Sequence, residues 1–295
     1  FYYCYDSNGY FYRVDPEEWI YNTVGKADGK VVEMTYDYAT NTMYGISSTG
    51  HSTALVRIDM NTGETTEIGS QDTKIVAMAS VPTAGDAATG FTDSKLYAIN
   101  EDCQLVTLSK DDGSATVDAN SDRYGIPDVA YVQSMTYDYN TGYIYWAQVY
   151  QSQNSSLYVL DLDGQTMYYA GVIGKVGSQV SGLVSIPKEG TVPDIPYVPL
   201  EGIALSAQDC VMVKGGKLQI RAKMVPYNAT SRNVSWSSDK PDVVDIDEGG
   251  VATAYNVGTA TITCTALDEE TRTTFTETLT VTVTEPIDTL SGFLL

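Results

Sequence analysis

The chain has 295 residues, of which 43% are hydrophobic and 19% charged, and its formal net charge is −21. This composition is typical of globular proteins, and the length suffices for two domains. Both halves are acidic and would repel phosphate backbones, so we expect no nucleic-acid partner, and no stretch reaches the roughly 18 apolar residues of a membrane span.

The first 25 residues read as three short strands rich in tyrosine. They are Phe1–Tyr5, Tyr10–Val14 and Trp19–Asn22. Abundant tyrosine with alternating side chains favours β-structure over helix. We interpret these strands as the second, third and fourth strands of a four-stranded unit whose first strand is absent.

A four-residue pattern recurs between residues 31 and 183. Its copies are Val31–Met34, Ile75–Met78, Val132–Met135 and Val180–Leu183, and their last residues are 44, 57 and 48 positions apart. The longer motif Met34–Tyr38, Met-Thr-Tyr-Asp-Tyr, returns unchanged at Met135–Tyr139. The first three copies are followed by tight turns and three more strands, so the sequence predicts four-stranded antiparallel blades of a β-propeller in residues 1–187.

The sequence leaves the number of blades open. Val180–Ile186 reads as one more first strand, so with residues 1–25 it would complete about four blades in a closed ring. The alternative is an arc that belongs to a larger propeller. We favour the arc slightly, because the chain begins inside a unit.

A second domain follows a proline-rich linker at residues 188–201. Residues 202–285 show short alternating strands typical of a β-sandwich, and residues 286–295 form a tail. The segment from 202 to 284 resembles the bacterial immunoglobulin-like group 2 family. The matching residues are Gly202–Ser206, Val213–Ile220, Val225, Pro226, Val234–Asp239, Pro241, Val244, Gly250–Tyr255, Gly258–Ile262 and Thr278–Val283. The resemblance implies an all-β sandwich and an extracellular or cell-surface bacterial protein. Independently of the resemblance, the alternation of Trp236 with Val234 predicts that Trp236 lies in the core.

The sequence points to no metal site and no cofactor. Cys4, Cys103, Cys210 and Cys264 form no Cys-x-x-Cys pair, and His51 is the only histidine. Zinc sites need closely spaced ligands. Bridges Cys4–Cys103 and Cys210–Cys264 remain possible, and free, buried thiols are the favoured interpretation.

Catalytic residues are not assigned. Asp37 and Asp138 occupy equivalent positions of the repeat, as do Asp59 and Asp161, and each lies next to a turn. Aspartates at such positions usually cap turns through their side chains. An active site would break the symmetry of the repeat, so we expect no enzyme, with an extracellular carbohydrate-active hydrolase as the alternative.

The longer loops between strands suggest a ligand-binding face. Residues 121–131 are inserted between two predicted blades, and residues 150–156 lengthen a neighbouring loop. Variable loops on a rigid scaffold commonly carry function. The predicted contacts combine aromatic rings with hydrogen-bonding side chains: Arg123, Tyr124, Tyr131, Tyr150, Gln151 and Gln153. We expect a non-enzymatic surface protein that binds an extracellular glycan or a host or matrix protein.

Overall fold

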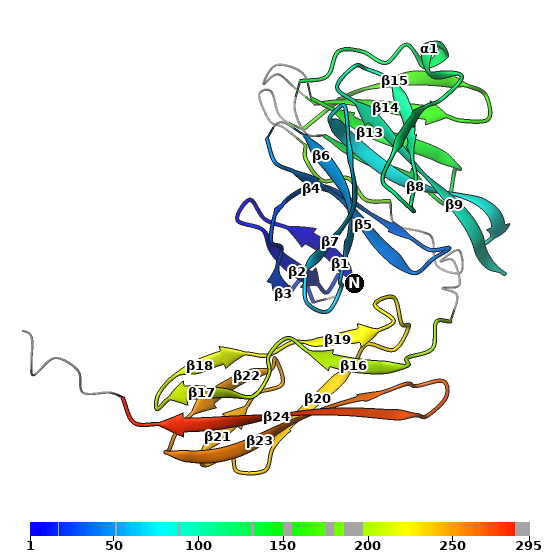
Figure 1. The fold of residues 1–295 in the computed structure, drawn as a ribbon. Helices are drawn as coiled ribbons and strands as arrows, with labels where there is room; N and C mark the ends of the chain where they lie inside the picture. Colours follow the sequence, from blue (N-terminus) through cyan, green and yellow to red (C-terminus); the bar gives the residue numbers. More distant parts are fainter. Residues whose placement is uncertain are drawn as a thin grey trace, which may run out of the picture. The chain divides into compact units, whose positions relative to one another are not determined.

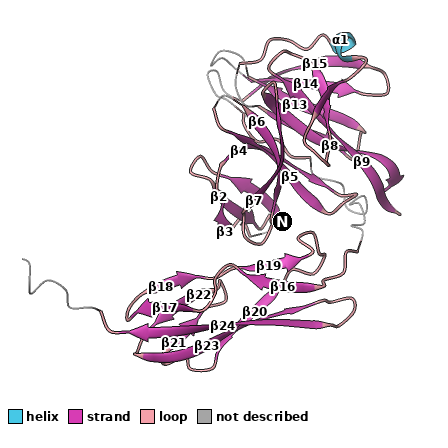
Figure 2. Ribbon diagram, viewed as in Figure 1, coloured by secondary structure: helices cyan, strands magenta, loops and turns pink. Residues whose placement is uncertain are grey.

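The computed structural model describes residues 1–16, 18–50, 52–87, 89–130, 133–149, 155–174, 180–185 and 197–286. The chain divides into two compact units, an N-terminal unit of residues 1–196 and a C-terminal unit of residues 197–295 (Figure 1). Strands dominate both units, and the one helix of the described part is α1, Ser121–Tyr124 (Figure 2). No helix in these ranges has the length and apolar character of a membrane span.

Four antiparallel sheets, each made of consecutive strands, form the N-terminal unit. Sheet 1 contains β1 (Tyr2–Tyr5), β2 (Tyr10–Val14) and β3 (Tyr21–Lys26). Sheet 2 contains β4 (Lys30–Asp37), β5 (Thr42–Ser48), β6 (Thr53–Ile58) and β7 (Thr65–Gln71). Sheet 3 contains β8 (Ile75–Asp86), β9 (Gly90–Asn100), β10 (Leu105–Leu108) and β11 (Ala115–Val117). Sheet 4 contains β12 (Ser134–Asp138), β13 (Tyr143–Gln148), β14 (Ser155–Asp161) and β15 (Thr166–Ile173).

The prediction of repeated four-stranded antiparallel units is confirmed in sheets 2, 3 and 4. Their first strands lie side by side, β4 next to β8 and β8 next to β12. In the described residues these sheets are separate in their strand pairing, and no strand of sheet 1 pairs with one of sheet 4.

A β-bulge shows which strands sheet 1 contains. Gly25 of β3 pairs with Phe11, and the register shifts at the next residue of β2. Sheets 2 and 4 have the same shift in their last two strands, at the pairs Gly69–Leu55 and Gly171–Leu157. The three strands of sheet 1 therefore correspond to the second, third and fourth strands of a unit, as their order in the sequence predicts.

Glycines bring neighbouring sheets into backbone contact. A Cβ atom added to Gly63 would lie 3.2 Å from the carbonyl carbon of Gly25, in sheet 1. A Cβ atom added to Gly69 would lie 1.8 Å from the carbonyl oxygen of Asp112, in the turn between β10 and β11. These positions tolerate no side chain, because the turn of one sheet rests on the bulge of the sheet before it.

Residues 180–185 run beside sheet 4 in the way that β8 runs beside sheet 2. The backbone N–H of Ile75 donates to Thr53 Oγ1 over 3.0 Å and that of Ser80 to Thr35 Oγ1 over 3.0 Å. The equivalent bonds join Val180 N–H to Ser155 Oγ over 2.8 Å and Ser185 N–H to Thr136 Oγ1 over 3.3 Å. The segment thus takes the place of a first strand, in agreement with its sequence pattern.

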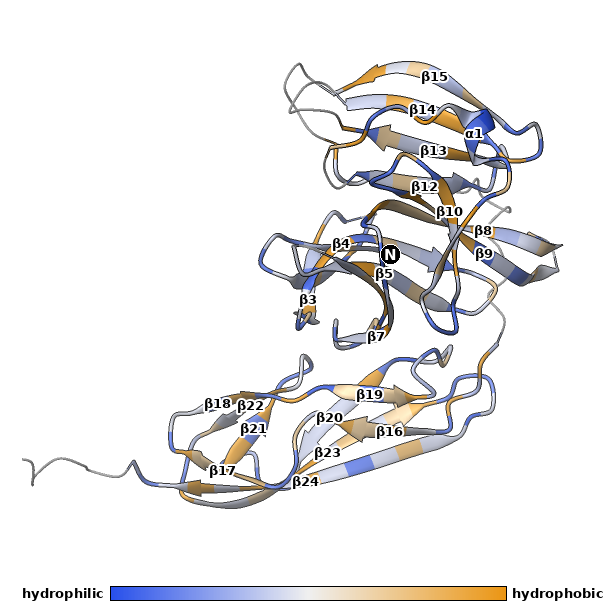
Figure 3. Ribbon diagram, turned by 45° about the horizontal axis from the view of Figure 1, so that its top comes forward, coloured by the Kyte–Doolittle hydropathy of each residue, from blue (hydrophilic) through white to orange (hydrophobic). Residues whose placement is uncertain are grey.

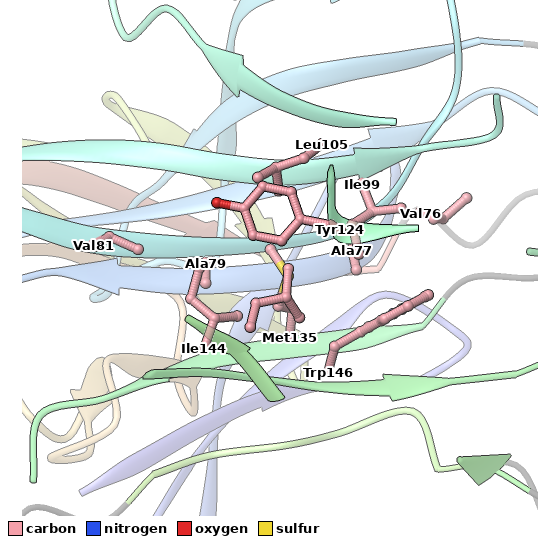
Figure 4. Close-up of a cluster of buried hydrophobic side chains, with 11 residues drawn as sticks. Val76, Ala77, Ala79, Val81, Ile99, Leu105, Tyr124, Met135, Ile144 and Trp146 are labelled. Carbon is pink, nitrogen blue, oxygen red and sulfur yellow. The ribbon is translucent and has the colours of Figure 1, made fainter. Parts of the chain in front are cut away.

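Hydrophobic side chains fill the spaces between the sheets. Figure 3 shows hydrophobic and hydrophilic residues alternating along many strands, as expected when one face of a strand is buried. The cluster between sheets 3 and 4 contains the fully buried Trp146, packed near Met135 and Ile144 (Figure 4). Burial of large side chains of this kind stabilises each by about 1.5–3 kcal/mol, and it fixes sheet 4 against sheet 3.

The C-terminal unit contains three small sheets. The first pairs β16 (Gly202–Leu205) with β19 (Ala222–Val225). The second has the order β17 (Cys210–Val213), β24 (Thr274–Thr284), β23 (Gly258–Leu267) and β20 (Val234–Ser238), with β17 parallel to β24. The third has the order β18 (Lys217–Gln219), β22 (Val251–Ala254) and β21 (Val244–Ile246).

The structure corrects two expectations for the C-terminal unit, the burial of Trp236 and the residue at which the unit begins. Trp236 is only partly buried, although it packs against both hydrophobic clusters of the unit, because β20 lies at the edge of its sheet. Residues 197–201, expected to end the linker, belong to the unit: the backbone of Val198 bonds with Thr230, and Leu200 is 4% exposed. The remainder of the proline-rich stretch, residues 186–196, lies outside the described residues.

All four cysteines are free, as favoured from the sequence. Cys264 is buried, which fits its place on the inner side of β23, whereas Cys4 is exposed and corrects the expectation that every thiol is buried. Cys4 lies on the side of β1 opposite to Tyr3 and Tyr5, which face the core.

Candidate functional site

The structure describes two of the six predicted ligand contacts. Arg123 and Tyr124 belong to α1, in the insertion that precedes β12. Tyr131, Tyr150, Gln151 and Gln153 lie outside the described residues.

Tyr124 does not present a ring to a ligand, which corrects the prediction. The side chain is 5% exposed and packs into the cluster between sheets 3 and 4 (Figure 4). Burial, with a smaller effect of Asp118, raises the pKa of its hydroxyl to about 12. Arg123, the neighbouring residue, is exposed and donates a hydrogen bond from Nη1 to Gln165 Oε1.

The inserted connection before β12 is held to sheet 4 by a chain of hydrogen bonds. Trp146 Nε1 donates to Gln133 Oε1 over 2.7 Å, and Gln133 Nε2 donates to the carbonyl of Val149 over 3.0 Å. Gln148 Nε2 donates to the carbonyl of Asp128 over 2.7 Å. Buried amides satisfied in this way fix the loop against the sheet. Gln133 was not predicted as a structural residue; it lies inside the copy Val132–Met135 of the recurring pattern, where the first two copies hold Val32 and Val76.

The repeated aspartates cap turns, as predicted. Asp37 accepts hydrogen bonds from the backbone N–H of Ala39 and the hydroxyl of Thr40. Asp138 accepts the equivalent bonds from Asn140 and Thr141. These contacts are local in sequence, which is why the spacing alone could predict them.

Asp37 also takes part in a buried cluster that joins sheets 2 and 3. Lys110 Nζ lies 2.7 Å from Asp37 Oδ2, and Ser94 Oγ donates to Asp37 Oδ1 over 2.6 Å. Lys110 Nζ also donates to Ser94 Oγ. A serine beside a lysine has the elements of a nucleophile and its base. Here, however, the lysine is paired with a carboxylate and Ser94 is 7% exposed, so the arrangement serves to link two sheets.

Tyrosines from the two copies of the Met-Thr-Tyr-Asp-Tyr motif meet in one aromatic cluster. The ring of Tyr38 lies 5.1 Å from that of Tyr139, and each contacts the earlier tyrosine of its own motif. Phe91 of β9 completes the cluster, 5.5 Å from Tyr139. Burial raises the pKa of the Tyr38 hydroxyl. The cluster is a packing feature: its tyrosine pairs meet edge to face and Phe91 is tilted against Tyr139, as is typical of protein interiors.

A buried carboxylate lies among the first strands. Glu33 of β4 is 7% exposed, and Oε1 accepts bonds from Ser134 Oγ at 3.4 Å and Met135 N–H at 3.3 Å. Burial raises the pKa of Glu33 well above its ordinary value, against the opposing effect of these bonds. The sequence offered one signal that was missed: the other repeats hold Ala77, Ser134 or Gly182 at this position.

A shallow groove of about 330 Å³ lies between sheet 4 and residues 180–185. It is lined by Thr136, Asp138, Asn140, Tyr145, Leu157, Leu183, Val184 and Ser185. Hydroxyl, amide and carboxylate groups beside one tyrosine ring can hold a polar ligand, and the volume is at the lower end for small-molecule sites.

No group of three or more histidine, cysteine or acidic side chains that could hold a metal ion occurs in the described part of the chain. His51 lies outside that part. Asp161 caps its turn by accepting a bond from the backbone N–H of Gly164. Asp37, Asp138 and Asp161 therefore cap turns, and of these three only Asp138 lines the groove.

Two curated proteins share part of the sequence. The kappa-carrageenase of Pseudoalteromonas carrageenovora is 34% identical over 79 residues, 27% of this chain and 20% of the enzyme. The 3-O-alpha-D-galactosyl-alpha-L-arabinofuranosidase of Bifidobacterium longum subsp. longum is 31% identical over 106 residues, 35% of this chain and 9% of the enzyme. This chain thus spans a fifth or less of the length of these relatives.

Solved structures give more distant similarities. A protein of unknown function from Bacteroides thetaiotaomicron VPI-5482 aligns with 57% of this chain and 40% of its own, with a TM-score of 0.36 at 14% identity. Domains 4 and 5 of the S-layer protein SbsC align with 66% of this chain and 97% of their own, with a TM-score of 0.25 at 16% identity. Similarities this low assign no fold to the N-terminal unit.

The C-terminal unit has a clear assignment. Residues 199–281 match the family model of the bacterial Ig-like domain (group 2). The match agrees with the all-β structure of this unit and with the motifs found in its sequence. Residues 199–281 therefore form a bacterial Ig-like domain of group 2.

Proposed function

We propose that this chain is part of an extracellular or cell-surface bacterial protein that binds its partner without catalysis. In this proposal the N-terminal unit is a propeller-like recognition head, and the Ig-like domain is a spacer. The observation that carries this proposal is that the repeated aspartates make structural contacts within the fold. Asp37 and Asp138 cap turns at equivalent repeat positions, and Asp37 is neutralised by Lys110.

The proposed ligand is an extracellular glycan or a host or matrix protein. Arg123 is the exposed, described member of the predicted contacts. The groove beside residues 180–185 offers hydroxyl and amide groups suited to sugar hydroxyls. The net charge of −21 favours neutral or basic ligands over polyanions.

The direct experiment is binding of the intact chain to an array of glycans and matrix proteins. The proposal expects saturable binding to a defined subset, with no change in the size of the bound glycan. Absence of binding across the array would refute the recognition role.

A second function is supported by the names of the relatives. Both are called glycan-cleaving enzymes, and each shares about a third of this chain or less. In that case the chain is an accessory part of an extracellular carbohydrate-active hydrolase. Incubation with neutral and acidic polysaccharides, followed by an assay for new reducing ends, separates the two functions, because only a hydrolase releases them.

A further inference from the structure

β15 is the outermost strand of sheet 4 (Figure 3). In the described part of the chain it pairs only with β14, so the backbone of its other edge is unpaired. Such an edge offers N–H and C=O groups to a further strand. Proteins usually protect it with a charged side chain, or they keep the edge strand short.

The outer strands of the other three sheets are protected in these two ways. β3 carries Lys26 and β7 carries Glu67, whereas β11 has three residues only. β15 has eight residues, and none of them is charged. Among these four outer strands, β15 is therefore the one that is open to pairing.

The shared β-bulge shows which residues of β7 and β15 are equivalent. Gly171 pairs with Leu157 as Gly69 pairs with Leu55. At three exposed positions a polar residue of β7 corresponds to a tyrosine or valine of β15: Thr66 to Tyr168, Glu67 to Tyr169 and Ser70 to Val172. The residues of β15 are 56%, 59% and 54% exposed. Large exposed apolar groups that lie together usually mark an interaction site.

Exposure at these three positions is a property of the outer strands of this fold. Sheet 2 has a neighbour on both sides, because Gly63 rests against sheet 1 and Gly69 against sheet 3. Thr66, Glu67 and Ser70 are nevertheless exposed. The exposure of the equivalent side chains of β15 therefore does not depend on whether a further sheet packs against sheet 4.

The two tyrosines of β15 are held in place. The ring of Tyr169 lies 5.5 Å from that of Tyr158, which in turn lies 5.3 Å from the buried Trp146. The hydroxyl of Tyr168 accepts a hydrogen bond from Thr166 Oγ1 over 3.0 Å. Neighbouring residues of a strand point to opposite faces, so the two rings flank the free edge from both sides. Side chains fixed before binding lose less conformational freedom when a partner docks.

Acidic residues lie near the start of β15. Asp161 and Asp163 precede the strand, and Asp122 belongs to α1, which approaches it. Arg123 is the basic residue of this group. The local charge is thus negative, as is the net charge of −21. Both favour a partner with lysine or arginine at this end of the strand, and both oppose the approach of a second copy.

We infer that the free edge of β15 binds an extended, basic segment of a partner protein and adds it to sheet 4 as a further strand. Main-chain hydrogen bonds supply the affinity, and Tyr168, Tyr169 and Val172 contact alternate side chains of the added strand. The inference rests on the proposed recognition of a host or matrix protein and assigns that recognition to β15. Arg123, predicted as a ligand contact, lies beside the same strand through its bond with Gln165.

The experiment measures binding of labelled synthetic peptides to the full chain by fluorescence anisotropy. The probes alternate valine and threonine and carry lysines at one end. Lysines at the N-terminus suit parallel addition to β15, and lysines at the C-terminus suit antiparallel addition. The same peptides with proline in place of threonine lack the N–H groups that pairing needs, so they should not bind.

Two variants of β15 test the site. The triple variant Tyr168→Thr, Tyr169→Glu, Val172→Ser gives β15 the residues of β7, so the fold should be retained, and the melting temperature checks this. It should weaken peptide binding about tenfold or more, because few anchoring side chains carry most of the affinity of an interface. The single variant Val172→Lys introduces the residue that sheet 1 has at this position, Lys26, and should also weaken binding.

Hydrogen exchange of the full chain locates the bound strand. The backbone N–H groups of β15 should exchange more slowly when the peptide is bound, and the triple variant should lose this effect. Tyr255→Thr combined with Val257→Ser is the matched control, because both residues are 52% exposed in the Ig-like domain. The control should bind the peptide as the wild type does.

The outcomes separate this inference from the proposed function. Peptide binding that both variants retain, or that leaves exchange in β15 unchanged, overturns strand addition. Binding of a matrix protein that the triple variant retains, without peptide binding, overturns strand addition and keeps protein recognition. A wild-type dimer that the triple variant abolishes shows that a second copy covers β15 and overturns the partner assignment. Glycan binding that the triple variant loses assigns the tyrosines to a glycan and likewise overturns it. Absence of binding to the peptides and to every member of the array overturns both proposals.

Discussion

Lys110 Nζ lies 2.7 Å from Asp37 Oδ2, and the pair joins sheet 3 to sheet 2 across 73 residues of sequence. The Asp37 side chain is 1% exposed and that of Lys110 is 20% exposed. Removal of one partner from a buried pair leaves the other charge without compensation, and this costs far more than the loss of a surface pair.

Lys110→Met should therefore lower the free energy of unfolding of the N-terminal unit by about 2–3 kcal/mol, less than for a fully buried pair because Lys110 is partly solvated. Urea denaturation measures the change. Lys214→Met is the matched control, since Lys214 and Glu285 form a pair 3.8 Å apart with both side chains exposed. That substitution should cost less than about 1 kcal/mol. Equal losses in the two variants would contradict a structural role for the buried pair.

Gly69→Ala should destabilise the contact between sheets 2 and 3. The new methyl group would lie 1.8 Å from the carbonyl oxygen of Asp112, so one backbone must move. Overpacking of this kind costs about 1–3 kcal/mol or more. Gly182→Ala is the control, because a Cβ atom at Gly182 has no neighbour within 4 Å. Thermal unfolding of both variants tests the contact, which would be refuted by equal melting temperatures.

Glu33→Gln should stabilise the protein at neutral pH. Because burial raises the pKa of Glu33 in the folded state, the folded protein holds a proton that the unfolded chain releases above about pH 4.3. The contribution of Glu33 to stability is therefore full below that pH and falls as pH rises toward the folded pKa of Glu33. The amide of glutamine keeps the acceptor for Ser134 and Met135 but does not titrate.

The measurement is the free energy of unfolding of wild type and Glu33→Gln between pH 4 and pH 8. The difference between the two proteins should grow with pH in favour of the variant. Glu67→Gln, at an exposed position of β7, serves as the control and should follow the wild type. Parallel curves for wild type and Glu33→Gln would show that Glu33 ionises freely in the folded protein.

Local chemistry explains what the sequence could predict. Asp37 and Asp138 bond with residues two and three positions away, so spacing alone indicated their turns. The alternation along the strands likewise predicted the four-stranded units. Contacts distant in sequence left no such pattern: Lys110 is 73 residues from Asp37, and Glu33 is 101 residues from Ser134.

Aromatic residues were the main source of error. The apolar run at Trp19 was read as a strand, but the strand begins at Tyr21, because Trp19 belongs to a turn in which its backbone N–H donates to the carbonyl of Asp15. Tyr124 was read as a ligand contact because it lies in an inserted loop. The short helix α1 turns its ring into the core, and no local pattern distinguishes that orientation from an exposed one.

Asp268 should make the stability of the Ig-like domain sensitive to acid. The carboxylate is 0% exposed and binds the start of the domain, accepting bonds from Tyr197 Oη at 2.7 Å and Leu200 N–H at 2.8 Å. Burial acts to raise its pKa, but hydrogen bonds from Leu200, Thr271, Tyr197 and Glu270 outweigh this effect and lower the pKa to about 2.

The folded pKa of Asp268 thus lies below that of the unfolded chain, near 3.9. Its contribution to stability is present above about pH 4 and is lost as pH falls toward 2.

Asp268→Asn should lower the melting temperature of the domain at pH 7 and reduce the dependence of that melting temperature on pH between 4 and 2. Asp245→Asn, at an exposed position of β21, is the control and should retain the acid sensitivity of the wild type. The measurement is thermal unfolding of the full chain, followed by tryptophan fluorescence in a Trp19→Phe background. Trp236 reports on the Ig-like domain, and Trp146 reports on the N-terminal unit. The signal of Trp146 is recorded separately in a Trp236→Phe variant. If Asp268→Asn keeps the acid sensitivity of the wild type, the hydrogen bonds at Tyr197 and Leu200 do not hold the start of the domain.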